Sequence, residues 1–192
     1  MRKLIGLSIS IALGLTAFAA APVAAMDYDG DKHFTGDKTI ASGHTYKDNV
    51  TVKNGTLTVY GTIEGNVKQF GPGNVVVRGG EIEGNVTERN GGAVKVLADG
   101  EVYGNVYERG RGNVILRGGS EVKGDVYEKW NGKVLVKGYD SEVYGNVEER
   151  HAGSVLVKDD GKVYGNVCEL GAGAVYVTNG GYVDGNVYTG SC

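Results

Sequence analysis

The segment Val102-Tyr103-Gly104-Asn105-Val106 is one copy of a five-residue motif that recurs along the chain. Its other copies begin at Ile63, Ile82, Val122, Val143, Val163 and Val183, and a degenerate copy begins at Tyr46. The seven full copies are separated by steps of 19, 20, 20, 21, 20 and 20 residues. A second apolar segment follows the motif in most copies, as in Val94-Lys95-Val96 and Val134-Leu135-Val136. A fixed period of this length is typical of a solenoid.

The residue pattern inside each copy has the period of a β-strand. Val102, Gly104 and Val106 fall on one face of an extended chain. Stacking the copies about 4.8 Å apart would lay valine on valine and bury that face. A sandwich or barrel of hairpins is the alternative, but hairpins do not require one residue type at the same column of every copy. We therefore expect an all-β, single-stranded β-solenoid (β-helix) over residues 46–192, with coils of about 20 residues, about seven to eight coils and a corner at each motif glycine.

The N-terminal residues have the pattern of a secretory signal peptide. Arg2 and Lys3 precede an apolar run at residues 4–21, and small residues end it at Ala25. A transmembrane anchor is the alternative, but the run is short and a proline follows it. We expect residues 1–25 to be removed, residues 26–45 to form a polar cap, and the protein to be exported to the periplasm, the cell surface or the medium.

Composition and charge restrict the classes of partner and activity that we expect. The formal net charge of −3 becomes −5 when Arg2 and Lys3 are lost, which gives no general attraction for nucleic acid. No second apolar run is long enough to span a membrane. The three histidines lack metal-ligand spacing, and no nucleotide-binding loop or nucleophile motif is present. We expect no enzyme activity and no cofactor.

One polar column runs through the motif. Its asparagines are Asn66, Asn85, Asn105, Asn146, Asn166 and Asn186, and Asp125 takes their place in one copy. Side-chain amides at equivalent positions can form a hydrogen-bonded ladder, as in cross-β stacks. The alternative is a row that binds a ligand or ice.

Two charged columns follow the last valine of the motif. One contains Gln69 and then Glu88, Glu108, Glu128, Glu149 and Glu169, and the next contains Arg89, Arg109, Lys129 and Arg150. We expect the two columns to offset each other as solvated ion pairs. Repetition in every coil argues against a catalytic role, because an active site is normally unique.

The tyrosines form a candidate binding strip. Tyr103, Tyr144 and Tyr164 share one column, and Tyr107, Tyr127 and Tyr188 share another. Alternation places both columns outside. They could reflect strand propensity alone, or they could bind glycans or an envelope partner.

The positions of the two cysteines suggest a disulfide that holds the C-terminal segment to the preceding coil. Cys168 occupies the column of Tyr107, and Cys192 lies four residues past Tyr188, one coil further on. An exported protein permits a Cys168–Cys192 disulfide. An intermolecular bond is the alternative.

The Glu-Val-x-Gly-Asn-Val unit, alternating with a Val-x-Val strand, resembles the repeats of bactofilins over residues 46–188. The resemblance implies a β-helical, nucleotide-free scaffold that polymerises end to end. Bactofilins differ in being cytoplasmic and in having a shorter repeat. The segment Gly71-Pro72-Gly73-Asn74 also resembles the repeats of curlins, although their Ser and Gln columns are missing.

These observations favour an exported structural scaffold that associates with itself, because an open solenoid end offers a route to polymerisation. A binding or adhesion module that uses the tyrosines is the second expectation, and a secreted amyloid-like fibre subunit is the third.

Overall fold

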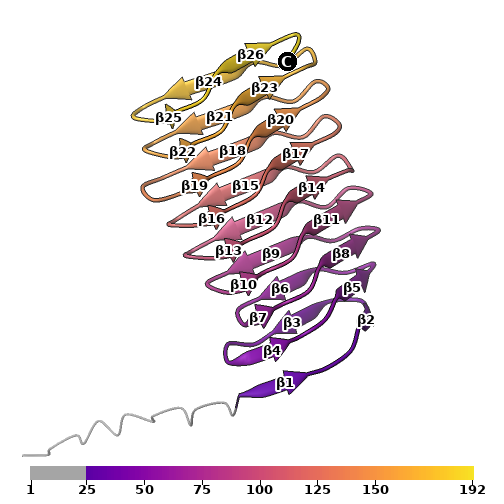
Figure 1. The fold of residues 1–192 in the computed structure, drawn as a ribbon. Helices are drawn as coiled ribbons and strands as arrows, with labels where there is room; N and C mark the ends of the chain where they lie inside the picture. Colours follow the sequence, from indigo (N-terminus) through magenta and orange to yellow (C-terminus); the bar gives the residue numbers. More distant parts are fainter. Residues whose placement is uncertain (1–24) are drawn as a thin grey trace, which may run out of the picture.

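The computed structural model describes residues 25–192 as a stack of parallel coils (Figure 1). It confirms the predicted all-β solenoid. Every element in this part of the chain is a strand, and every strand pairing is between parallel strands of different coils. The described residues contain no helix with the length and apolarity that a membrane span requires. Residues 1–24, which hold nearly all of the predicted signal peptide, lie outside the described part.

Three sheets form the walls of the stack. The first sheet contains β1 (Met26–Tyr28), β4 (His44–Tyr46), β7 (Thr62–Ile63), β10 (Glu81–Ile82), β13 (Glu101–Val102), β16 (Glu121–Val122), β19 (Glu142–Val143), β22 (Lys162–Val163) and β25 (Tyr182–Val183). The second contains β2 (Lys32–Thr35), β5 (Val50–Lys53), β8 (Val67–Phe70), β11 (Val86–Arg89), β14 (Val106–Glu108), β17 (Val126–Glu128), β20 (Val147–Glu149), β23 (Val167–Glu169) and β26 (Val187–Thr189). The third contains β3 (Lys38–Ile40), β6 (Leu57–Val59), β9 (Val75–Arg78), β12 (Val94–Leu97), β15 (Val114–Arg117), β18 (Val134–Lys137), β21 (Val155–Lys158) and β24 (Val175–Thr178).

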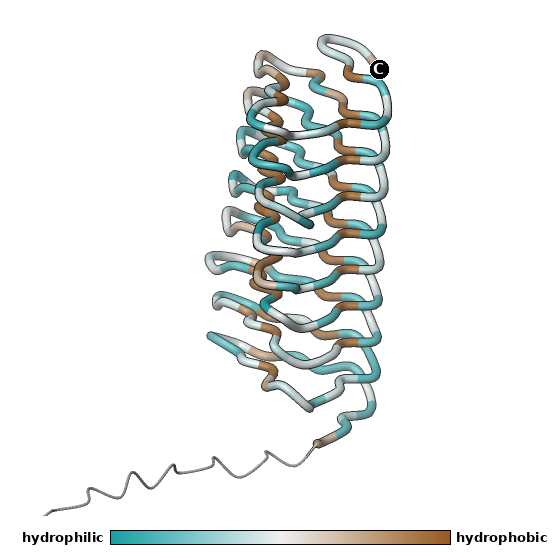
Figure 2. The backbone as a smooth tube through the Cα atoms, turned by 90° about the vertical axis from the view of Figure 1, so that its left-hand side faces the viewer, coloured by the Kyte–Doolittle hydropathy of each residue, from teal (hydrophilic) through white to brown (hydrophobic). Residues whose placement is uncertain are grey.

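The register places each repeat directly over the next. Val106 pairs with Val126, and Val126 pairs with Val147. The same alignment holds in the third sheet, where Val114 pairs with Val134. The predicted columns are therefore real rows along the rod, and apolar positions recur in each coil (Figure 2).

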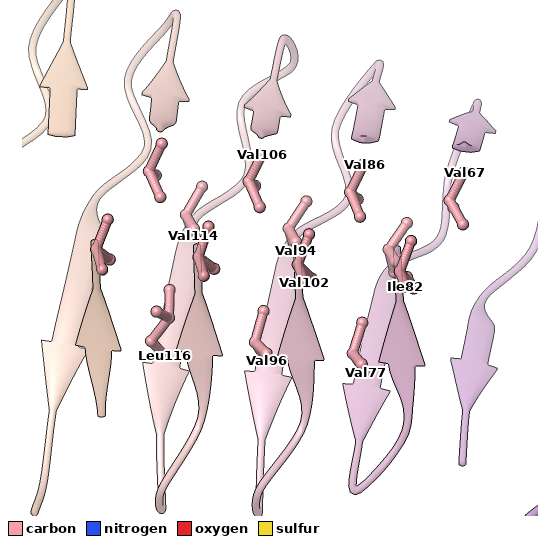
Figure 3. Packing of buried hydrophobic residues seen from close by; sticks show 14 of the residues in the cluster. Val67, Val77, Ile82, Val86, Val94, Val96, Val102, Val106, Val114 and Leu116 are labelled. Carbon is pink, nitrogen blue, oxygen red and sulfur yellow. The ribbon is translucent and has the colours of Figure 1, made fainter. Parts of the chain in front are cut away.

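The core is a narrow column of valines enclosed by the three sheets (Figure 3). Val86, Val102 and Val114 each come from a different sheet and have no exposed surface. Each fully buried valine contributes about 1.5 kcal/mol of hydrophobic stabilisation. Because each coil supplies only a few such residues, the stability of one coil depends on its neighbours.

The glycine of the motif forms the corner between the first and second sheets, as predicted. In the coil that begins at β13, Gly104 lies between β13 and β14, and a Cβ atom there would be 2.5 Å from the carbonyl oxygen of Gly84 in the preceding coil. No side chain fits so close to a stacked backbone, so the coil spacing itself requires glycine at this corner.

Residues 26–45 continue the coil. β1, β2 and β3 each add a strand to one sheet, in register with β4, β5 and β6. This segment therefore forms the first layer of the stack.

Candidate functional site

The C-terminal end of the stack is the strongest candidate for a functional site. β24, β25 and β26 are the outermost strands of the three sheets, and each has one free edge among the described residues (Figure 1). Val177 is 42% exposed and Val187 is 47% exposed, whereas Val157 and Val167, their equivalents one coil earlier, are 0% exposed. The valine columns of the core therefore reach the surface at this end.

The N-terminal end is built differently. Lys38 pairs with Leu57 and Lys32 pairs with Val50, so lysines take two core columns in the first coil. Lys32 Nζ donates a hydrogen bond to the carbonyl oxygen of Asp29 at 2.6 Å. Charged side chains at core positions discourage a further coil from stacking on this end, because burying an ammonium group is costly.

Aromatic rings complete this N-terminal layer. The ring centroids of Tyr28 and Tyr46 are 4.5 Å apart, and those of Phe34 and Tyr46 are 6.3 Å apart. Lys38 Nζ lies 4.4 Å from the centroid of Phe34, within the range of a cation–π interaction. The first coil therefore covers its own core and holds its lysines in place.

A disulfide joins Cys168 to Cys192, with their Cα atoms 6.1 Å apart. Cys168 lies in β23, one coil before β26, and is 6% exposed. After β26 the chain therefore turns back along the side of the stack, and residues 190–192 leave the exposed valines of the last coil uncovered.

The asparagines of the motif form a continuous ladder. The side-chain oxygen of Asn85 accepts a hydrogen bond from the backbone N–H of Asn105 at 2.8 Å, and Asn105 accepts in the same way from Asp125 at 2.7 Å. The other predicted members, Asn66, Asn146, Asn166 and Asn186, take part through the same type of bond. The side-chain oxygens from Asn66 to Asn166 hold the corner backbone of the next coil and are thus occupied within the protein, whereas Asn186, in the last coil, takes part only through its backbone N–H.

A second set of side-chain acceptors, not anticipated from the sequence, supports the corner before the third sheet. Asn74 Oδ1 accepts from the N–H of Ala93 at 3.0 Å, and Asn113 Oδ1 accepts from the N–H of Lys133 at 2.7 Å. In the sequence, the only sign of these acceptors is a polar residue directly before the second apolar segment of some copies.

The predicted tyrosine strip consists of two separate columns. Tyr107 and Tyr127 stack at 5.2 Å with an angle of 4° between their planes. Tyr144 and Tyr164 stack at 5.0 Å in the other column. The rings therefore stack in two pairs along the rod, and the hydroxyl groups of Tyr127 and Tyr164 donate to carboxylates of the protein, Asp125 at 3.0 Å and Glu142 at 3.3 Å. Tyr103 and Tyr188 are 47% and 39% exposed.

The glutamate column corrects a prediction. We expected solvated ion pairs, but Glu88, Glu108, Glu128, Glu149 and Glu169 are all 0% exposed. The same alternation that directs Tyr107 outward directs Glu108 inward with Val106. The neighbouring Arg89, Arg109, Lys129 and Arg150 are exposed on the other face and form no ion pair with these glutamates, so the two columns do not offset each other.

Each buried glutamate uses one carboxyl oxygen to hold a turn. Oε1 of Glu88 accepts from the N–H of Gly92 at 2.8 Å, and Oε1 of Glu108 accepts from the N–H of Gly110 at 2.8 Å. The corresponding donors to Glu128, Glu149 and Glu169 are the backbone N–H groups of Trp130, His151 and Gly171. Oε2 of all five glutamates has no hydrogen-bond partner among residues 25–192.

Burial raises the pKa of three members of this row. Loss of solvation is the main cause that raises the pKa of Glu108 to about 10, and the neighbouring carboxyl groups of Glu88 and Glu128 raise it further. Burial also raises the pKa of Glu149, and it raises the pKa of Glu169 to about 7. Glu142 differs: burial alone would raise its pKa, but Lys162 Nζ at 2.8 Å lowers it. A nearby cation thus decides whether a buried carboxyl here is charged.

Residues 25–192 contain no group of three or more His, Cys, Asp or Glu side chains that could hold a metal ion. No protein-family model, curated protein or solved structure matches this chain.

Proposed function

We propose that this protein is an exported structural rod that joins to a second copy of itself through its C-terminal end. The observation that carries the proposal is the uncovered last coil, where Val177 and Val187 are exposed in columns that are fully buried one coil earlier. Free strand edges and exposed valines together are a template for further strand pairing. A second copy is the partner whose coil dimensions and column spacing fit this end.

The difference between the two ends favours a particular arrangement. Stacking the first coil of one copy on the last coil of another would place Lys32 over Val187 and Lys38 over Val175, by the register of the sheets. Pairing two C-terminal ends would instead bury valine against valine. Such a contact is isologous and closes a pair of rods end to end. Filaments would need a further contact, either head to tail or along the sides.

Export and a scaffold role are part of the proposal. The signal-peptide pattern of residues 1–25 supports a location in the periplasm, at the cell surface or in the medium. The resemblance of the repeat to bactofilins supports the scaffold role. The repeated composition of every coil supports a structural rather than an enzymatic protein.

The test is the association state of residues 26–192 by sedimentation velocity, with negative-stain electron microscopy on the same sample. We expect the wild-type chain to form paired rods or longer assemblies. Val177→Lys with Val187→Lys should yield single rods, because the added charges would be buried in the contact. Tyr176→Lys is the matched control, since Tyr176 lies on the outer side of the same strand and is already 52% exposed.

Two results would contradict the proposal. One is a wild-type protein that stays a single rod at the highest soluble concentration. The other is a Val177→Lys, Val187→Lys variant that associates as strongly as the wild type while keeping its β-sheet circular dichroism.

A further inference from the structure

The row formed by Glu88, Glu108, Glu128, Glu149 and Glu169 has no role in the proposed contact between rods, yet it runs through five consecutive coils. Glu88 pairs in register with Glu108, Glu108 with Glu128, Glu128 with Glu149, and Glu149 with Glu169. Neighbouring carboxyl groups are therefore about one coil apart, about 4.8 Å. At that spacing, inside a core, like charges repel strongly.

No buried cation in the described part of the chain compensates the row. Among the described residues the buried polar side chains are these five glutamates, Glu142, Gln69, Ser120 and Ser141. From the second sheet the row meets only its own members, ending at Gln69 on one side and Thr189 on the other. The turns contribute backbone N–H groups. The third sheet presents valines such as Val94 and Val114 to the core.

The nearest charged groups point away from the row. Arg89, Arg109, Lys129 and Arg150 each follow a row member, and all four are exposed. Arg109 lies over the ring of Tyr107 with its guanidinium carbon 5.2 Å from the centroid, and Arg150 pairs with Glu148. The ring of His151 stacks on Trp130 at the surface. Lys95 of the third sheet and Lys133, which directly precedes β18, are not buried.

We propose that the glutamate row binds protons at neutral pH, with carboxyl groups hydrogen-bonded from coil to coil, and that their loss at alkaline pH loosens the stack. Five ionised carboxylates in this setting would be uncompensated buried charges, which proteins avoid. A protonated carboxyl can donate through its O–H to the carboxyl above or below it. The five Oε2 atoms that lack other partners are the atoms available for these bonds.

Gln69 shows what a neutral member of the row looks like. It occupies the same column, pairs in register with Glu88 and is also 0% exposed. Its Nε2 donates to the carbonyl oxygens of Gly55, Gly71 and Pro72 at 3.1–3.2 Å. An uncharged side chain of glutamate's shape therefore fits this position.

The direction of the pH effect follows from linkage. The pKa values of Glu108 and Glu169 rise from an ordinary value of 4.5 to about 10 and about 7, so above pH 4.5 the folded protein holds more protons than the unfolded chain. Stability should be fully present below about pH 4.5 and should fall as the pH rises through 7 towards 10. This is opposite to the behaviour of a protein held together by ionised carboxylates.

The experiment is the melting temperature of residues 26–192 between pH 5 and pH 9. We expect the wild type to melt roughly 10 °C lower at pH 9 than at pH 5. Glu108→Gln with Glu169→Gln should reduce that difference and should melt above the wild type at pH 9. Glu83→Gln is the control, because Glu83 is exposed and its substitution should leave the difference unchanged.

Infrared spectroscopy of the folded wild type provides a second measurement that does not depend on a variant folding. We expect an absorption band of protonated carboxyl groups at pH 7, which weakens as the pH rises and is smaller in the Glu108→Gln, Glu169→Gln variant. A melting temperature that is flat or rises from pH 5 to pH 9 would overturn the proposal. So would the absence of a protonated carboxyl band above pH 6.

Discussion

At the scale of single residues, the fold depends on which side chains fit where one coil stacks on the next. The motif glycines leave no room for a Cβ atom, the asparagines hold the corner backbone, and the valines fill the core. The period-two pattern predicted which side of the strand each residue faces. The same pattern places Glu108 on the inner face with Val106. We nevertheless expected solvated ion pairs, because a glutamate is almost never buried without a partner.

Gly84→Ala tests the corner. A Cβ atom at this position would lie 2.5 Å from the carbonyl oxygen of Gly65, so one coil must shift. We expect a loss of about 2–3 kcal/mol in the free energy of unfolding, measured by urea denaturation. Glu83→Ala, at the exposed residue just before it, should change stability by less than about 0.5 kcal/mol. Equal effects of the two substitutions would refute the steric account.

Substitutions of Asn105 test the hydrogen-bonded asparagine ladder. Asn105→Ala removes the oxygen that accepts from the N–H of Asp125, and should cost about 1 kcal/mol in the free energy of unfolding. Asn105→Asp should cost less, because Asp125 already fills the same column and accepts from Asn146. The account fails here if the two variants are equally destabilised in the same urea titration.

At the scale of strands and turns, the repeat predicted the stacked coils and the corner at the glycine. It did not reveal that the turns after the second sheet are held from inside by buried carboxyl oxygens, because the glutamate column has the same spacing whether its carboxyl groups face solvent or a turn. The sequence predicted a polar cap at residues 26–45 and an open end, but not that lysines would take core columns of the first coil. That placement depends on the register that aligns Lys32 with Val50 and Lys38 with Leu57.

The Cys168–Cys192 disulfide is predicted to stabilise the last coil. Cys168 and Cys192 are separated by 24 residues, and closing a loop of that size stabilises by about 3 kcal/mol. Reduction should therefore speed amide hydrogen exchange in β24, β25 and β26, while β14 in the middle of the stack keeps its protection. Uniform acceleration along the whole rod would contradict a local role for the bond.

At the scale of the whole molecule, the fold was predictable because a solenoid repeats one set of local rules in every coil. The way molecules meet was not, since it depends on the end coils, where the repeat is broken. The valines of the last coil belong to the same columns as the buried ones and differ only in lacking a neighbour.

Export predicts the N-terminus of the mature protein. Cleavage after Ala25 should leave Met26 as the first residue, and mass spectrometry of the protein recovered from an expressing bacterium would show this. Recovery of the uncleaved chain in the membrane fraction would favour the anchor instead.

Hydrogen exchange of wild-type residues 26–192, measured at low and at high protein concentration, tests the central claim most directly. The account predicts that amides of β24, β25 and β26 gain protection as the concentration rises, while those of β1, β2 and β3 do not change. Protection of the C-terminal strands that is independent of concentration would contradict self-association through this end. A gain at both ends would show that the rods stack head to tail, against the arrangement proposed from Lys32 and Lys38.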